Sequence, residues 1–208
     1  MIIDKLHYIS QEPEQGSHLT AIEKVLRSGC KWIQLRVKEK PSATVLQFAM
    51  IANELCERFQ AKLIVNDFPE IALQSNAYGV HLGLDDMPVP EARAILGPDK
   101  CIGGTANTFE HILKRAEEGV DYIGLGPFRF TTTKKNLSPV LGAEGYARLL
   151  QQVREAGIEI PIIAIGGIGL EDIPVLKETG IYGVAVSGLL TYSNDLNEHV
   201  KTLYREIT

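Results

Sequence analysis

The chain has 208 residues, of which 45% are hydrophobic and 23% are charged, and its formal net charge is −5. This length and composition predict one globular domain over residues 1–208. The acidic balance argues against nucleic acid or an anionic membrane as a partner, because both favour a concentrated basic surface. The longest apolar stretch, Ile160 to Ile165, has the length of a strand, well short of the roughly 18 residues of a membrane span.

The three cysteines, Cys30, Cys56 and Cys101, are widely spaced and lack the CxxC or Cys/His spacing of a zinc site. The segment Met1 to Lys5 lacks the apolar region of a secretory signal. Reduced thiols without an export signal predict a cytoplasmic protein.

Short strand-like runs alternate with longer amphipathic runs along the chain. The clearest helix is predicted from Ala43 to Phe59, with an apolar face made by Val45, Leu46, Ala49, Ala52, Leu55 and Cys56. Eight strands are predicted, at Leu6 to Ser10, Trp32 to Arg36, Lys62 to Val65, Gly79 to His81, Cys101 to Gly103, Tyr122 to Leu125, Ile162 to Ala164 and Gly183 to Val186.

Eight strands with helical crossovers predict an α/β fold, a single (β/α)8 barrel of the TIM type. An open doubly wound sheet is the alternative. The glycine-rich segments come late in the chain, however, and the first strand-to-helix turn, Ser10 to Ser17, contains no GxGxxG. In a barrel the functional groups gather where the strands end.

The second predicted strand ends in Gln34-Leu-Arg-Val-Lys38. Strand alternation sends Gln34, Arg36 and Lys38 to one side, where two cations and an amide could hold a diphosphate. The other interpretation is a solvated basic edge, since Lys and Arg are mostly surface residues.

The third predicted strand ends in Asn66-Asp67, and the fourth is followed by Asp85 and Asp86. Asp67 and one of these two aspartates could share Mg²⁺, which binds one or two carboxylates together with substrate phosphate. The alternative for Asn66-Asp67 is turn or helix-capping chemistry. His81, inside the fourth strand, is interpreted as a buried, hydrogen-bonded structural imidazole.

The sixth strand is followed by Thr131-Thr-Thr-Lys134 and a long connection to Gly142. The last two strands lead into Ala164-Ile-Gly-Gly and Gly183-Val-Ala-Val-Ser-Gly188. Hydroxyls, a cation and glycine N–H groups at these positions indicate a phosphorylated substrate. The alternative for the threonine-rich connection is disorder, and the alternative for the glycines is ordinary turn formation.

Taken together and in order from Gln34 to Ser187, these elements resemble the thiamin phosphate synthase (thiamin-phosphate pyrophosphorylase) family. The elements are Gln-Leu-Arg-x-Lys, Asn-Asp, Gly-Val-His-Leu-Gly-x-x-Asp, Gly-Pro-x-x-x-Thr-x-Thr-Lys and Ala-Ile-Gly-Gly-Ile. The resemblance implies a magnesium-dependent transferase that joins hydroxymethylpyrimidine diphosphate to hydroxyethylthiazole phosphate. Pyrophosphate leaves first, and the thiazole nitrogen then captures the pyrimidine cation.

The resemblance also implies residue roles. The metal would be held by Asp67 and Asp86, and Thr105 would contact the pyrimidine. The diphosphate would be held by Gln34, Arg36, Lys38, Asn66 and Lys134, and the thiazole phosphate by Thr131, Thr133, Gly167, Val186 and Ser187. Catalysis would fall to Arg36, Lys38, Thr105 and Lys134. Magnesium and the cations would stabilise charge on the leaving diphosphate, a role that needs no protein nucleophile. The chain departs from the family pattern at Leu84, Thr105 and Asn107, where Gln, Ser and His are usual.

Two other functions remain open. A thiazole tautomerase of the same barrel family tends to lack the diphosphate-binding cations and to use a His after the fifth strand, where this chain has Thr105-Ala-Asn107. A noncatalytic barrel that binds a phosphorylated ligand would need the late glycines but neither the carboxylates nor the cations. The sequence leaves the oligomeric state open, a homo-oligomer included.

Overall fold

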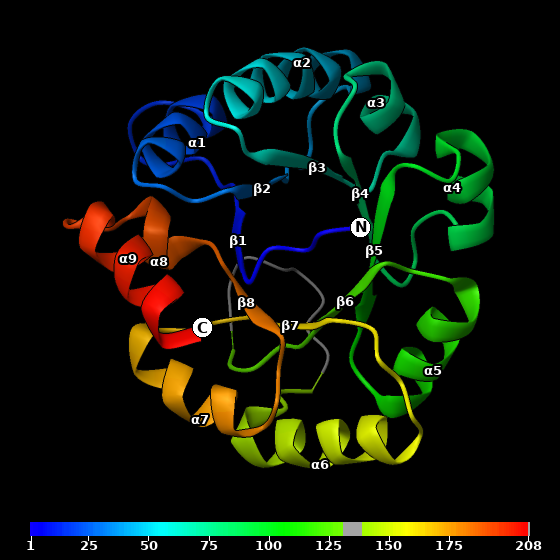
Figure 1. The fold of residues 1–208 in the computed structure, drawn as a ribbon. Helices are drawn as coiled ribbons and strands as arrows, with labels where there is room; N and C mark the ends of the chain where they lie inside the picture. Colours follow the sequence, from blue (N-terminus) through cyan, green and yellow to red (C-terminus); the bar gives the residue numbers. More distant parts are fainter. Residues whose placement is uncertain (131–138, 208) are drawn as a thin grey trace.

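The computed structural model describes residues 1–130 and 139–207. Within them, eight parallel strands form a closed barrel in chain order, with helices around its outside (Figure 1). The predicted (β/α)8 barrel is therefore confirmed, and the doubly wound sheet is wrong. The strands are β1 (Leu6–Ile9), β2 (Trp32–Leu35), β3 (Lys62–Asn66), β4 (Gly79–Leu82), β5 (Cys101–Ala106), β6 (Tyr122–Leu125), β7 (Ile162–Ile165) and β8 (Gly183–Val186).

The helices follow the strands and carry their apolar faces inward. They are α1 (His18–Arg27), α2 (Ser42–Arg58), α3 (Pro69–Gln74), α4 (Val89–Leu96), α5 (Phe109–Glu118), α6 (Gly142–Glu155), the 3-10 turn η1 (Leu170–Asp172), α7 (Ile173–Glu178), α8 (Gly188–Thr191) and α9 (Leu196–Ile207). On α2 the predicted face is buried except for Leu46, which is half-buried. No helix among the described residues is long and apolar enough to cross a membrane.

Strand ends differ in places from the prediction. β2 ends at Leu35, so Arg36 lies in the loop, whereas β5 continues past Gly103 to Ala106. The extension of β5 pairs with β6, Thr105 opposite Gly124 and Ala106 opposite Leu125. These pairs add backbone hydrogen bonds that outweigh the low strand propensity of the glycines before them.

Side chains alternate along the strands between two apolar layers. One layer packs between the strands and the helices. The other fills the barrel and includes Ile9, Trp32, Ile64, Cys101, Tyr122, Ile163 and Ala185. The interior is therefore packed, and a ligand has to bind at one end of the barrel.

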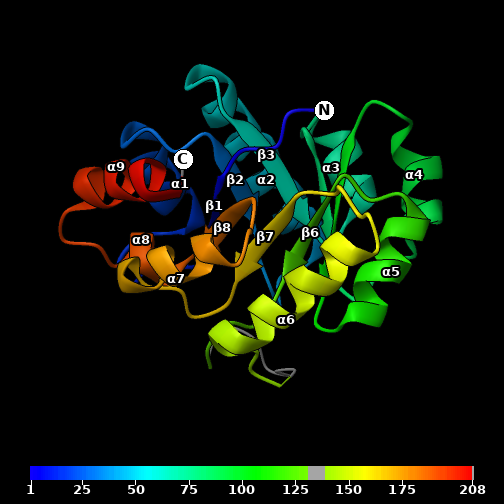
Figure 2. The same cartoon turned by 60° about the horizontal axis from the view of Figure 1, so that its bottom comes forward.

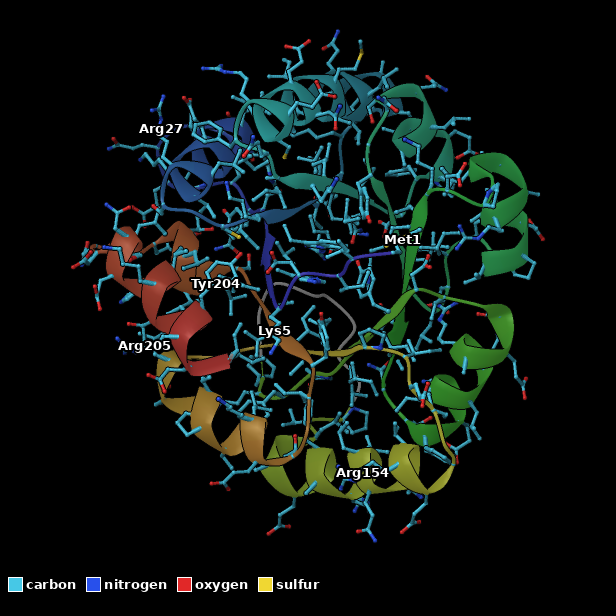
Figure 3. All side chains as sticks on the ribbon, viewed as in Figure 1. Met1, Lys5, Arg27, Arg154, Tyr204 and Arg205 are labelled. Carbon is cyan, nitrogen blue, oxygen red and sulfur yellow. The ribbon has the colours of Figure 1, made fainter. Side chains whose placement is uncertain are left out.

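The N-terminal segment covers the end where the strands begin. Ile3 joins the interior layer, the Tyr182 hydroxyl donates to its carbonyl at 2.8 Å, and the His7 Nε2–H donates to the Asp4 carbonyl at 2.8 Å. Met1 and Lys5 lie within the ring of helices in Figure 3. In the side view of Figure 2 the N-terminus lies at the end of the barrel opposite the start of α6. A ligand site therefore belongs at the end where the strands finish.

Candidate active site at the strand ends

Amides and charges from β2 and β3 meet at this end of the barrel. Gln34 and Asn66 are buried, and the Gln34 Nε2 donates to the Asn66 Oδ1 at 2.7 Å. The Asn66 amide donates to one carboxylate oxygen of Asp67, and the Lys38 ammonium pairs with the other. Neither residue caps α3, whose N-cap is Phe68. The structure thus brings together four predicted site residues, and helix capping does not explain Asn66-Asp67.

The backbone fixes Asp67 between β3 and β4. Its φ is 71°, in the left-handed region that Asp and Asn tolerate better than most residues. Its N–H donates to the His81 carbonyl at 2.9 Å. The carboxylate is therefore presented from a constrained turn.

Asp86 is the aspartate after β4 that interacts with Asp67. One of its oxygens accepts the Gly83 N–H at 2.6 Å. Burial raises the pKa of Asp86, and the neighbouring Asp67 carboxyl raises it further, while the Gly83 bond lowers it. Asp85, the other predicted candidate, is exposed. Two facing carboxylates at adjacent strand ends form a pair that a divalent cation would stabilise.

The donor set fits a hard cation such as Mg²⁺. No cluster of three or more potential metal-ligating side chains occurs in residues 1–130 and 139–207. Two carboxylates alone suit an ion that keeps several waters and completes its shell with substrate phosphate oxygens. Zn²⁺ would require a richer set of nitrogen or sulfur ligands.

Arg36 adds a partly buried cation. Burial lowers the pKa of its guanidinium, and the charge of Asp67 raises it. The Arg36 N–H donates to the Ser10 Oγ at 3.1 Å, and that hydroxyl is hydrogen-bonded to the His18 Nδ1 at 2.9 Å. The end of β1 therefore supports the segment that carries the predicted diphosphate-binding residues, a contribution that the sequence interpretation did not include.

A hydrogen-bonded chain leads from the barrel interior to Thr105. The His81 Nδ1 is 3.0 Å from the Tyr122 hydroxyl, and its Nε2 is 3.1 Å from the Thr105 Oγ1. Burial raises the pKa of Tyr122 well above its ordinary value, so the phenol stays protonated. These contacts fit the structural interpretation of His81, which orients the hydroxyl of Thr105.

The predicted phosphate residues Gly167, Val186 and Ser187 lie at the ends of β7 and β8. Gly167 has φ of 68°, and an added Cβ would lie 2.9 Å from the Arg129 Cβ. The Ser187 Oγ is buried without a hydrogen-bond partner among the described residues. The positive φ and the close contact with Arg129 both require a glycine at position 167. An unpaired buried hydroxyl at the neighbouring strand end suits a phosphate.

Thr131, Thr133 and Lys134 lie outside the described residues. Residues near both ends of that segment are held close to the glycines after β7. The Arg129 N–H donates to the Gly166 carbonyl at 2.8 Å, and the Gly142 N–H donates to the Phe128 carbonyl at 3.1 Å. The connection after β6 therefore starts and finishes at the candidate site.

Sequence reasoning also missed Arg115 of α5. Its side chain is buried, and it donates to the carbonyls of Gly83 and Thr105. The available signal was an arginine one turn after Ile112, on the apolar face of the helix.

The chain is similar in sequence and in fold to proteins of one family. A family model described as thiamine monophosphate synthase matches residues 6–190. A thiamine-phosphate synthase of Flavobacterium psychrophilum is 49% identical over 204 residues, which are 98% of this chain and 99% of the relative. One of Bacteroides fragilis is 50% identical over 198 residues, 95% of this chain and 97% of the relative. A solved thiamine phosphate pyrophosphorylase from Pyrococcus furiosus aligns with a TM-score of 0.83 and 28% identity, over 98% of this chain and 95% of that one.

Proposed function

The chain belongs to the thiamine monophosphate synthase family, transferases of thiamine biosynthesis, and we propose that it condenses hydroxymethylpyrimidine diphosphate with hydroxyethylthiazole phosphate. The products would be thiamin phosphate and pyrophosphate. The observation that carries this proposal is the cluster of Gln34, Lys38, Asn66, Asp67 and Asp86 at three adjacent strand ends. It combines neutral donors, a cation and paired carboxylates, which is what a metal-bound diphosphate requires.

The reaction needs the bond between the pyrimidine methylene carbon and the diphosphate oxygen to break, with the electron pair leaving on the diphosphate. Mg²⁺ held by Asp67 and Asp86 would neutralise part of that growing charge. Lys38 and Arg36 would add fixed positive charge, and Gln34 would donate from a buried position. Lys134 is assigned to the same task by sequence alone.

The thiazole nitrogen would then attack the cationic methylene carbon, which is a dissociative route. This route needs no protein nucleophile, and it fits the amides, carboxylates and cations that gather at the ends of β2, β3 and β4. Thr105, held by His81, would contact the pyrimidine. Gly167, Val186 and Ser187, with Thr131 and Thr133, would hold the thiazole phosphate so that its ring faces the carbon.

The two alternatives fit the site less well. A tautomerase would place a His after β5, where the Asn107 amide donates to the Gly126 carbonyl. A noncatalytic phosphate binder has no use for a buried amide pair beside two carboxylates. We also propose a cytoplasmic location, since Cys30, Cys56 and Cys101 are all buried free thiols.

The proposal is tested by incubating the purified protein with Mg²⁺ and both substrates and measuring pyrophosphate and thiamin phosphate. Asp67→Asn and Asp86→Asn should each lower kcat/KM roughly a hundredfold or more, because metal-ion stabilisation supplies several kcal/mol. Asp85→Asn is the matched control and should stay near wild type, since Asp85 is exposed. No product from the wild-type protein, under conditions in which a known synthase turns over, would refute the proposal.

A further inference from the structure

Arg115 joins two parts of the candidate site from outside the barrel. Its side chain comes from α5 and is only 5% exposed. The Arg115 Nη2 donates to the Gly83 carbonyl at 2.6 Å, and its Nε donates to the Thr105 carbonyl at 3.1 Å. One guanidinium therefore links the turn after β4 to the end of β5.

The surrounding residues accommodate this side chain closely. An added Cβ at Gly104 would lie 2.8 Å from the Arg115 Cδ and 2.9 Å from its Nε. Glu118 accepts from the Arg115 Nη1 at 2.8 Å and balances the charge. A buried arginine is rare unless it is paired and hydrogen-bonded. Gly104 thus leaves room for the Arg115 side chain, and Glu118 neutralises its charge.

The two carbonyls that accept from Arg115 belong to residues that are connected to predicted functional groups. Gly83 accepts from Arg115 through its carbonyl and donates through its N–H to the Asp86 carboxylate at 2.6 Å. Thr105 is held by Arg115 through its carbonyl and by His81 through its hydroxyl. Arg115 therefore contacts the backbone of Thr105 and of the residue that hydrogen-bonds the Asp86 carboxylate.

We propose that Arg115 is a positioning residue that holds the metal-binding turn and the pyrimidine-contacting threonine in register. This inference rests on the proposed function, because it assigns Asp86 to the metal and Thr105 to the pyrimidine. Within the described residues, Arg115 donates to no side chain assigned to the metal or to a substrate, and it would act through two backbone carbonyls. A lysine cannot replace it, because a single ammonium lacks the planar fork that bonds Gly83, Thr105 and Glu118 at once.

Arg93 provides a matched control at the other end of the barrel. It also donates to backbone carbonyls, those of Gly97 and Lys100, and pairs with the Asp121 carboxylate at 2.9 Å. These contacts precede β5 and β6, away from the strand ends that carry the site. Arg93→Met therefore removes a similar cross-link without touching the site.

The experiment compares the wild-type protein with Arg115→Lys, Arg115→Met and Arg93→Met. It measures kcat, the Mg²⁺ concentration for half-maximal rate, thermal unfolding, and calorimetric binding of magnesium pyrophosphate without substrates. Both Arg115 variants should bind magnesium pyrophosphate 10- to 100-fold more weakly and need more Mg²⁺, which is roughly the effect of losing support behind a metal ligand. Arg93→Met should lower only the unfolding temperature.

Arg115→Lys keeps a positive charge beside Glu118, so it provides the measurement if Arg115→Met does not fold. If the folded Arg115 variants keep the wild-type magnesium requirement and pyrophosphate affinity, the positioning role is refuted. A wild-type protein that forms no thiamin phosphate refutes the proposed function instead, whatever the variants do.

Discussion

The packing inside the barrel predicts that Gly103→Ala damages both fold and site. An added Cβ at Gly103 would lie 2.1 Å from the Tyr122 Cζ and 2.5 Å from its hydroxyl oxygen, where ordinary contact begins at 3.4 Å. The Tyr122 ring cannot easily move aside. It is 1% exposed and lies against the rings of His7, Trp32 and His81.

Two costs follow from displacing this ring. Overpacking a filled core costs about 1–3 kcal/mol. Pulling the Tyr122 hydroxyl from the His81 Nδ1 leaves a buried group unpaired, at a further cost of about 1–3 kcal/mol. The free energy of unfolding should therefore fall by roughly 4 kcal/mol. Because His81 also holds Thr105, kcat should fall in whatever protein still folds.

Urea unfolding followed by circular dichroism measures the stability change. Gly188→Ala is the control, because its Cβ would meet nothing closer than 3.5 Å, and its effect should stay within about 0.5 kcal/mol. In a Tyr122→Leu background the atoms that clash are absent, so Gly103→Ala should cost much less there. An equal cost in both backgrounds would refute the steric argument.

Two further predictions concern single side chains. Burial lowers the pKa of His7 to about 3. Between pH 6.5 and 3 the unfolded chain therefore binds a proton that the folded chain does not, and the free energy of unfolding decreases as the pH is lowered. At pH 5 this amounts to about 2 kcal/mol. His7→Phe should therefore lose that much less stability between pH 7 and pH 5 than wild type, and equal losses in parallel urea titrations would contradict the assignment. Thr105→Val keeps the side-chain volume but removes the hydroxyl, so KM for the pyrimidine diphosphate should rise roughly tenfold. An unchanged KM, or a shifted Mg²⁺ requirement, would remove Thr105 from pyrimidine contact.

The strands could be predicted from the sequence because each is a short apolar run between longer amphipathic ones. The continuation of β5 past Gly103 could not, since two successive glycines, Gly103 and Gly104, are poor strand formers. Tertiary packing requires both glycines, because Gly103 faces the Tyr122 ring inside the barrel and Gly104 faces the Arg115 side chain outside it. A pattern of residues along one strand carries no information about the side chains that pack against it.

The same limit applies to the site. The sequence placed Asn66-Asp67 and two aspartates at neighbouring strand ends but could not choose between Asp85 and Asp86. The choice depends on a local bond, the Gly83 N–H to Asp86, that orients this carboxylate toward Asp67. Arg115 went unpredicted because an arginine on a helix is ordinarily a surface residue.

The turn that presents Asp86 does not depend on the side chain at position 84, where the family resemblance predicts a glutamine and this chain has Leu84. The turn is fixed at Gly83, whose N–H holds the Asp86 carboxylate and whose carbonyl accepts from Arg115. Neither bond involves the side chain at position 84, so the orientation of Asp86 does not depend on a polar residue there. Asn107, another departure, donates to the Gly126 carbonyl and thereby ties the end of β5 to that of β6. Neighbouring strand ends are thus bonded to one another, and the geometry of the site resides in these links rather than in any one loop residue.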